Sequence, residues 1–187
     1  MRGKKSRKKY VIAIILLIVI IAAGWFFWAS RANTTVHTGI DIMLDGQGGR
    51  NASALVIYQP GRTSFSEDVA RDLADGICKS GYRVRITTVN PELSDDLSGY
   101  DLVVFSSPVY MGACSPLIED YVKSIRNYGK AEVAFCATGM LESAPELEAV
   151  EQWFSAHPLK KIGKISKQMY LDEENCARNW GQEIAGE

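Results

Sequence analysis

The sequence predicts an α/β protein in which a parallel sheet is covered by helices on both of its faces. Short segments rich in β-branched and aromatic residues alternate with segments of helical periodicity. The clearest unit is 100–122, where the apolar run 102–105 is followed by a polar loop and then by a helix. A continuous apolar run is typical of a strand that is buried on both faces. Open α/β sheets hold their ligands at the carboxyl ends of such strands.

A basic tail and a long apolar segment precede this pattern. Residues 1–9 carry six basic side chains and no acid, and residues 10–28 carry no charge. As a helix, the uncharged segment would reach about 28 Å, close to the hydrocarbon thickness of a bilayer. We therefore predict a transmembrane anchor over residues 10–29, with the basic tail in the cytoplasm and the following domain on the other side of the cell membrane. The alternative is a cleaved signal peptide, although its apolar core is normally shorter.

A linker is expected over residues 30–53, between the anchor and a domain at 54–187. Glycine residues at 46, 48 and 49 indicate flexibility in its second half, and residues 38–44 are a candidate for a short additional strand. Residues 1–31 hold seven basic groups and no acid. Without them the net charge of −1 becomes −8, so the domain is not expected to attract nucleic acid.

The first strand of the domain is predicted at residues 54–58, and a helix is predicted from about residue 67 to residue 80. Ser64 and Glu67 have the spacing of a capping box at the start of this helix. A turn rich in hydroxyl groups at a helix N-terminus offers free N–H groups and a positive dipole end to a phosphate. An ordinary capped turn is the alternative, because the acidic side chains Glu67 and Asp68 would repel an anion placed too close.

The remaining elements follow the same alternation. Further strands are predicted at residues 83–89, 102–105, 131–137 and, more weakly, 162–169, and residues 90–99 are predicted to be mainly a connection. Helices are predicted from Ser115 to Gly129, from Ser143 to His157 and from Cys176 onward. Four lysines lie around the last strand and suit a protected sheet edge; they are Lys160, Lys161, Lys164 and Lys167.

Three loops fall at carboxyl ends of predicted strands: the first loop (59–66), the second loop (106–114) and the third loop (137–141). The second loop contains Ser107-Pro108-Val109-Tyr110 followed by Gly112, which resembles the S-P-x-Y-x-G loop of flavodoxin-like oxidoreductases. With the hydroxyl groups of the first loop and Thr138-Gly139 in the third, residues 54–154 resemble the flavodoxin family. This resemblance implies a three-layer sandwich with a five-stranded parallel sheet in the order 2-1-3-4-5.

The resemblance also implies an FMN cofactor, with its phosphate on the first loop and its ring clamped between the second and third loops. Tyr110 would then stack on the ring, although packing onto its own sheet is the alternative. Residues 58–61 depart from the family's S-x-T-G-x-T pattern, which weakens the phosphate site. The implied binding residues are Gln59, Pro60, Gly61, Arg62, Thr63, Ser64 and Ser66 in the first loop, Ser107, Pro108, Val109, Tyr110, Met111 and Gly112 in the second, and Thr138 and Gly139 in the third.

Together these expectations describe a membrane-tethered flavodoxin-like protein that carries electrons or reduces a small acceptor such as a quinone. Its partner would be a redox protein or that acceptor, and the flavin would perform the transfer. A surplus of negative charge would disfavour the anionic reduced flavin and lower its reduction potential. The alternative, favoured by the unusual first loop, is a flavin-free module of the same fold that acts as a membrane-anchored binding or assembly protein.

Other chemistries have little support in the sequence. His37 and His157 belong to no metal-ligand cluster, and no G-x-S-x-G motif is present, so neither a metal nor a catalytic side chain is predicted. Cys136 and Cys176 lie at positions expected in the core. Cys114 precedes a helix N-terminus, which would stabilise a thiolate, whereas packing within the loop is the alternative.

Overall fold

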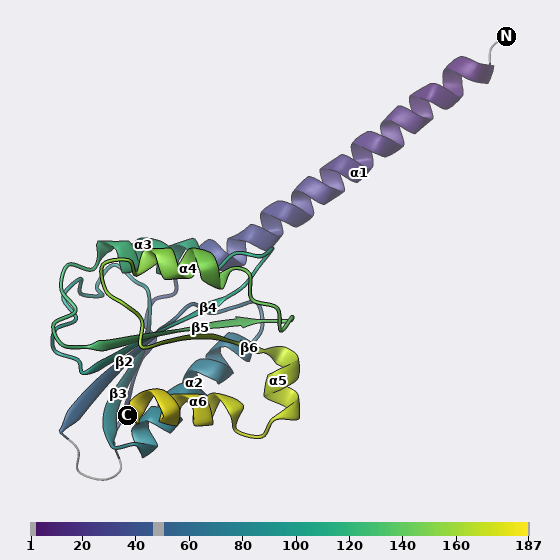
Figure 1. Ribbon diagram of the computed structural model, residues 1–187. Helices are drawn as coiled ribbons and strands as arrows, with labels where there is room; N and C mark the ends of the chain where they lie inside the picture. The colour runs from purple at the N-terminus through teal and green to yellow at the C-terminus, as the bar shows by residue number, and fades with distance from the viewer. Residues whose placement is uncertain (1–2, 47–50, 187) are drawn as a thin grey trace. The chain divides into compact units, whose positions relative to one another are not determined.

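The computed structural model describes residues 3–46 and 51–186 and divides into two units, residues 1–32 and 33–187, which we treat separately. Helix α1, Gly3–Thr34, contains the apolar segment Lys9–Trp28, with a mean hydropathy of 2.9 and none of its surface buried (Figure 1). This segment is long and apolar enough to cross a membrane, and a signal sequence has the same character. Arg2 of the predicted basic tail and residues 47–50 of the predicted linker lie outside the described residues.

The second unit is built on a six-stranded sheet in the order β1-β3-β2-β4-β5-β6. Strands β2 to β6 are parallel to one another, as predicted, and their order is the expected 2-1-3-4-5. The sheet has one strand more than the five predicted, because β1 pairs antiparallel to β3 at the edge. The strands are β1 (Asp41–Leu44), β2 (Ala52–Tyr58), β3 (Tyr82–Thr88), β4 (Leu102–Pro108), β5 (Glu132–Gly139) and β6 (Lys161–Ser166).

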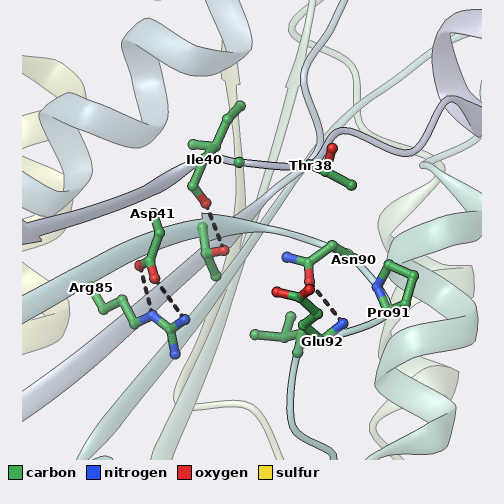
Figure 2. A pocket seen from close by; sticks show the side chains of 10 residues that line it. Thr38, Ile40, Asp41, Arg85, Asn90, Pro91 and Glu92 are labelled. Carbon is green, nitrogen blue, oxygen red and sulfur yellow. Dashed lines mark hydrogen bonds and ion pairs between the residues drawn. The ribbon is translucent and has the colours of Figure 1, made fainter.

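Strand β1 comes from the stretch expected to be a linker, within the candidate strand 38–44. It covers the outer edge of β3, whose backbone groups would otherwise have no partner in the sheet. Figure 2 shows how side chains reinforce this pairing: both carboxylate oxygens of Asp41 accept hydrogen bonds from Arg85, at 2.8 and 2.9 Å. The Thr87 hydroxyl also donates to the carbonyl oxygen of Ile40, at 2.9 Å. The sheet therefore includes the chain just after α1.

Helices cover both faces of the sheet, with α2 and α6 on one face and α3 and α4 on the other (Figure 1). On the α2 and α6 face, Val84 and Ile86 of β3 pack with Ile77 and Ile184. On the α3 and α4 face, Phe105 and Phe135 form the centre of the second core cluster. The helices are α2 (Phe65–Lys79), α3 (Pro116–Ser124), α4 (Leu147–Trp153), α5 (Lys167–Asp172) and α6 (Cys176–Ala185).

Several predicted helix ends differ from the structure. Ser115 caps α3 as expected, since its hydroxyl accepts from the Leu117 N–H, but α3 ends at Ser124, before Gly129. The predicted capping box of Ser64 and Glu67 does not form. Ser64 is at the N-cap position of α2 without a capping bond, and its hydroxyl donates instead to Asp68 at 2.8 Å. Helix α4 begins only after Glu146, because the side chain of Glu146 is turned into the protein interior.

The connection from β3 to β4 contains no helix in the described residues 89–101, as the sequence predicted. Parallel strands are usually joined through a helix, so another interaction must hold this crossover on the sheet. Leu97 is buried in the core cluster on the α3 and α4 face, and the Tyr121 hydroxyl donates to the Ser94 carbonyl at 2.6 Å. The crossover is thus held by the buried Leu97 and by a hydrogen bond to α3.

Candidate functional site

The three loops predicted to form a site follow β2, β4 and β5, which are neighbours in the sheet. Because these strands are parallel, their carboxyl ends lie at the same edge. Strands β4 and β5 extend to Pro108 and Gly139, so they include the first residues of the predicted second and third loops. The order of the strands therefore brings the first loop beside the second, and the second beside the third.

Tyr110 joins the second loop to the first. The backbone N–H of Arg62 donates to the Tyr110 hydroxyl oxygen at 2.7 Å, and the guanidinium of Arg62 lies 5.1 Å from the centre of the Tyr110 ring. Gly61 is needed at this contact. A Cβ there would lie 3.1 Å from the Tyr110 hydroxyl and 3.0 Å from the Ser66 Oγ. Close approach between the two loops thus depends on a residue without a side chain.

Ser66 and Thr138 join the first loop to the third. Their hydroxyl oxygens are 2.9 Å apart, and both side chains are buried. The second loop is tied to the third as well, because the Val109 N–H donates to the Thr138 carbonyl at 2.7 Å. All three predicted loops are therefore connected by direct hydrogen bonds between site residues.

The second loop turns sharply at Met111 and Gly112. Tyr110 and Ala113 exchange backbone hydrogen bonds of 3.0 and 3.1 Å, and φ is 54° at Met111 and 77° at Gly112. Positive φ at both central residues is the signature of a type I′ turn, which glycine adopts without strain and methionine rarely does. The turn leaves the side chain of Met111 exposed at the tip of the loop.

Ser107 and Pro108 support the second loop from within the protein. The buried Ser107 hydroxyl accepts a 2.7 Å hydrogen bond from the backbone N–H of Ser115, the residue that caps α3. Pro108 is the last residue of β4 and is also buried. The structure therefore assigns these two residues to the frame of the loop, whereas Val109 and Tyr110 lie at its surface.

A cavity of about 330 Å³ lies between the second loop and the residues that follow β5. Its lining is mainly apolar, with exposed Met111, Met140 and Leu141 at the rim. Five predicted site residues line it: Val109, Tyr110, Met111, Gly112 and Gly139. The lining residues that the sequence did not indicate include Met140, Leu141, Pro145, Glu146 and Lys164.

Lys164 and Glu146 form an ion pair at the wall of this cavity. The Lys164 Nζ lies 2.7 Å from the Glu146 Oε1, and the side chains are only 5% and 3% exposed. The same Nζ donates to the Ser143 carbonyl at 2.6 Å. Lys164 was interpreted as one of the charges that protect a sheet edge, and this interpretation was wrong. In a short polar strand, nothing in one sequence distinguishes a lysine that points inward from one that points to solvent.

Gln59 lies at the end of β2, in the predicted first loop, and its side chain is only 1% exposed. Its Nε2 donates to the carbonyl oxygen of Thr35 at 2.9 Å. Thr88, at the end of β3, donates in the same way to the carbonyl oxygen of His37 at 2.7 Å. The chain that follows α1 is therefore bound along the edge of the sheet where the first loop begins. Gln59 serves this attachment, which no sequence pattern indicated.

A second cavity, of about 450 Å³, lies between β1 and the residues that follow β3, and Figure 2 shows its lining. Of the three charged residues that line it, Arg85 and Asp41 form a bidentate ion pair, and Glu92 is the third. The Asn90 side chain accepts from the Glu92 N–H at 2.9 Å and so shapes the loop. None of the predicted site residues lines this cavity.

A model of the flavodoxin domain matches residues 58–169, which is more than half of the chain. The chain belongs to the flavodoxin domain family. The matched region contains all three loops and every residue that lines the cavity beside the second loop, including Glu146 and Lys164. A comparison with curated protein sequences finds no match.

Solved structures share the flavodoxin fold at low sequence identity. The two-electron reduced flavodoxin of Megasphaera elsdenii has a TM-score of 0.56 and 16% identity, over 71% of this chain and 98% of that protein. A flavodoxin from the domain Archaea has a TM-score of 0.55 and 12% identity, over 71% and 96%. The Flv1 flavodiiron core of Synechocystis sp. PCC6803 has a TM-score of 0.55 and 16% identity, over 73% of this chain. The match spans only 36% of that core.

The cavity of this flavodoxin domain fits the ring of FMN. A flat aromatic ring needs an apolar slot with few polar groups, and the lining between Val109 and Leu141 supplies one. The backbone can approach a ligand closely at Gly112, where a Cβ would meet nothing within 4 Å, whereas the Lys164 side chain lies where a Cβ of Gly139 would point. Tyr110 also lines the slot and supplies an aromatic ring.

The first loop and the N-terminus of α2 offer a less favourable environment for the phosphate of FMN than the cavity offers for its ring. Helix α2 has N–H groups in its first turn that make no helical hydrogen bond, because the first such bond runs from the Asp68 N–H to the Ser64 carbonyl, and one of them, the Phe65 N–H, donates to the Thr63 hydroxyl at 3.4 Å. Thr63 is exposed beside them, and Arg62 adds a positive charge. Against this, the Ser64 hydroxyl is bonded to Asp68, and Glu67 adds a second acid to the same turn. A phosphate here depends on N–H groups and Thr63 more than on Ser64.

Cys114 does not have the environment of a reactive thiolate. Its side chain is buried, and burial raises the pKa of the thiol to about 12, while a hydrogen bond with Ser107 acts in the opposite direction. At neutral pH this thiol is therefore protonated. The structure favours the packing interpretation, because the desolvation of the charged form outweighs the effect of the helix N-terminus. Among the described residues, no group of three or more His, Cys, Asp or Glu side chains could hold a metal ion.

Proposed function

We propose that this chain is an FMN-binding electron-transfer protein that α1 holds at a membrane. The observation that supports it best is the apolar cavity between the loops after β4 and β5, lined by Val109, Tyr110 and Gly139. This cavity lies at the carboxyl edge of a parallel sheet, where open α/β folds bind their ligands. Membership of the flavodoxin domain family supports the same cofactor.

FMN would supply the electron transfer when bound, and the protein's own residues would bind and orient it. Tyr110 offers an aromatic surface, and its bond to the Arg62 N–H keeps that ring in place. The hydrogen bond between Ser66 and Thr138 holds the first loop, which would bind the phosphate, at a fixed position relative to the third loop, which would contact the ring. Val109, Met140 and Leu141 exclude water from the ring, which strengthens electrostatic interactions with it.

The phosphate would bind at the N-terminus of α2. The N–H groups of its first turn, the Thr63 hydroxyl and the charge of Arg62 are the favourable groups, with Ser66 beside them. Glu67 lies in the same turn, but it is engaged with Arg71 in an ion pair of 2.7 Å, which reduces its repulsion of an anion. By holding the phosphate, these interactions would orient the bound FMN so that its ring enters the cavity.

The apolar helix supports a membrane location, with the domain on the extracytoplasmic side because the basic residues precede the helix. Only residues 29–34 separate Trp28 from Thr35, whose carbonyl oxygen is bonded to Gln59 of the first loop. The candidate site is thus linked to the anchor by a short length of chain. This favours a redox partner or a small acceptor that resides in the bilayer, such as a quinone.

One observation favours the alternative function, a flavin-free binding or assembly module. Three polar groups of the first loop are already engaged within the protein: Gln59 with Thr35, Ser64 with Asp68, and the Arg62 N–H with Tyr110. Because these three donors are already engaged, the loop has fewer donors to offer a phosphate. Under this alternative the exposed apolar rim would contact a protein partner.

Purification of the full chain in detergent distinguishes the two functions. The FMN proposal predicts a yellow protein with flavin absorption bands, which releases FMN on denaturation, or an apo-protein that regains these bands when FMN is added. Sidedness is tested with a cysteine at the exposed Val36 position, in a variant without the native cysteines. A membrane-impermeant thiol reagent should label it in intact cells, and labelling only after lysis would contradict the proposed orientation.

A further inference from the structure

The ion pair between Lys164 and Glu146 stands out because both side chains are almost fully buried, yet both line the ring cavity. Lys164 lies against the third loop. A Cβ on Gly139 would be 3.0 Å from the Lys164 Cε and 3.5 Å from its Nζ. The ammonium group is held from its other side by the Ser143 carbonyl, at 2.6 Å. A fixed positive charge is thus built into the wall beside Gly139.

This pair is not explained by stability. Two charges removed from water lose their hydration, and their mutual attraction often does no more than offset that loss. The pairing is also incomplete, since the Glu146 Oε1 has no hydrogen bond of good geometry within the described structure, although Lys164 Nζ is 2.7 Å away. By contrast, Lys160, the residue just before the same strand, pairs with Glu132 where the two side chains are 25% and 50% exposed.

We propose that Lys164 is the residue that sets the reduction potential of the cofactor, with Glu146 as the residue that positions and partly offsets its charge. This inference rests on the proposed binding of FMN. Two electrons and one proton convert oxidised FMN into its anionic reduced form, so reduction adds one negative charge at the ring. A positive charge in a dry cavity wall stabilises that form over the neutral oxidised ring.

The positive charge of Lys164 acts locally, and its effect on the reduction potential is opposite in sign to the effect of the domain's net negative charge. The chain beyond residue 31 carries a net charge of −8, which by itself disfavours a reduced, anionic ring. Most of that charge is on the surface, where water and salt screen it, whereas Lys164 is screened much less. Lys164 therefore acts against the effect of the surface charge, and Glu146, which is equally buried, offsets part of that action.

The test is the ratio of the dissociation constants for oxidised and reduced FMN, measured on the full chain in detergent. Lys164→Gln removes the charge and keeps a donor for Glu146 and for the Ser143 carbonyl. We expect it to lower this ratio about tenfold, equivalent to about 30 mV for a two-electron couple. Lys160→Gln is the matched control, because it removes an equal charge just before the same strand and outside the cavity lining. It should leave the ratio unchanged.

Glu146→Gln provides a second measurement of opposite sign. Removing the negative partner should raise the ratio, and this variant decides the question if Lys164→Gln does not fold. Equal ratios in wild type, Lys164→Gln and Glu146→Gln would overturn the inference while leaving FMN binding intact. If the wild-type chain binds neither form of FMN, the proposed function fails and the inference fails with it. A ratio lowered by Lys164→Gln and not by Lys160→Gln would establish it.

Discussion

The hydroxyl oxygen of Tyr110 lies 2.7 Å from the backbone nitrogen of Arg62, and this hydrogen bond fastens the loop after β4 to the loop after β2. The guanidinium of Arg62 lies over the same ring. Tyr110 therefore combines two roles: its hydroxyl orders the first loop, and its ring lines the cavity. The two roles can be separated by substitution: Tyr110→Phe keeps the ring without the hydroxyl, and Tyr110→Ala removes both.

Tyr110→Ala should weaken FMN binding about tenfold, since an aromatic ring packed on a flavin contributes about 0.5–1.5 kcal/mol beyond its buried area. It should also restore the fluorescence of bound flavin, which a stacked phenol quenches. Tyr110→Phe should keep most of the ring's contribution to binding, but it should lose both the quenching, because it has no phenol, and the hydrogen bond to the first loop. Binding is measured by titration and stability by thermal unfolding of the apo-protein. A loss of several kcal/mol in the stability of the apo-protein would mark Tyr110 as core packing instead.

The double variant Thr63→Ala, Ser66→Ala should weaken binding of FMN far more than binding of riboflavin, which has no phosphate. The structure requires a control, because Ser66 also bonds to Thr138. Thr138→Val breaks that bond and leaves the Ser66 hydroxyl free for a phosphate, so it should not discriminate between the two ligands. Titrations of both flavins against both variants provide the comparison. Similar losses for FMN and riboflavin in the double variant would show that Thr63 and Ser66 shape the fold only.

The attachment of β1 to β3 predicts a dependence on pH. The hydrogen-bonded Arg85 guanidinium lowers the pKa of Asp41 below its ordinary value. A lowered folded-state pKa means that the contribution to stability is complete above the unfolded pKa and is lost as pH falls through the folded one. The protection factor of the β1 amides, which is the intrinsic exchange rate divided by the observed rate, should therefore fall as the solution becomes acidic. The effect corresponds to no more than about 1 kcal/mol, because the pair is largely exposed.

Asp41→Asn tests the same contact at neutral pH. It should accelerate amide exchange in β1 without changing exchange in β2, in the centre of the sheet, and the acid dependence in β1 should be much weaker than in wild type. Exchange detected by mass spectrometry of peptides resolves the two strands. Unchanged protection of β1 in this variant would show that the backbone pairing alone holds the sixth strand.

The pKa of about 12 for the Cys114 thiol predicts that it resists alkylation in the folded protein. At neutral pH, iodoacetamide should modify Cys176 first, because it is the one of the four cysteines that is partly exposed. Cys114 should react only after unfolding, and Cys114→Ser should leave the redox behaviour of the protein unchanged. Peptide mapping after timed alkylation gives the order. Rapid modification of Cys114 would restore the thiolate interpretation.

The sequence predicted the elements whose burial is uniform. The apolar run at residues 102–105 and the alternation of strands with helices gave the parallel order, because a strand buried on both faces leaves few other placements. The second loop was located for the same reason, since its residues directly follow such a strand. Strand β1 was harder to predict: it is short, half-exposed and held by the Asp41–Arg85 pair from a distant part of the chain.

Side-chain direction was the part of the site that the sequence could not supply. Lys164 lies in a strand where every residue except the last two is partly exposed, so its burial against Glu146 leaves no periodic signal. Gln59 and Ser64 are polar loop residues that suit ligand binding, yet tertiary contacts with Thr35 and Asp68 engage them. Patterns of residue type predict where the site lies, whereas hydrogen bonds decide which of its groups remain available.

The central claim, that FMN binds with its ring between the second and third loops, is tested by one titration. The full chain in detergent is titrated with FMN and followed by its visible spectrum, in wild type and in Val109→Trp, which fills the cavity. We predict a shifted flavin spectrum and a dissociation constant of about 1 µM or lower for wild type. Val109→Trp should bind at least about tenfold more weakly with an unchanged melting temperature. Equal binding by both proteins, or no binding by wild type at about 100 µM FMN, would contradict the claim.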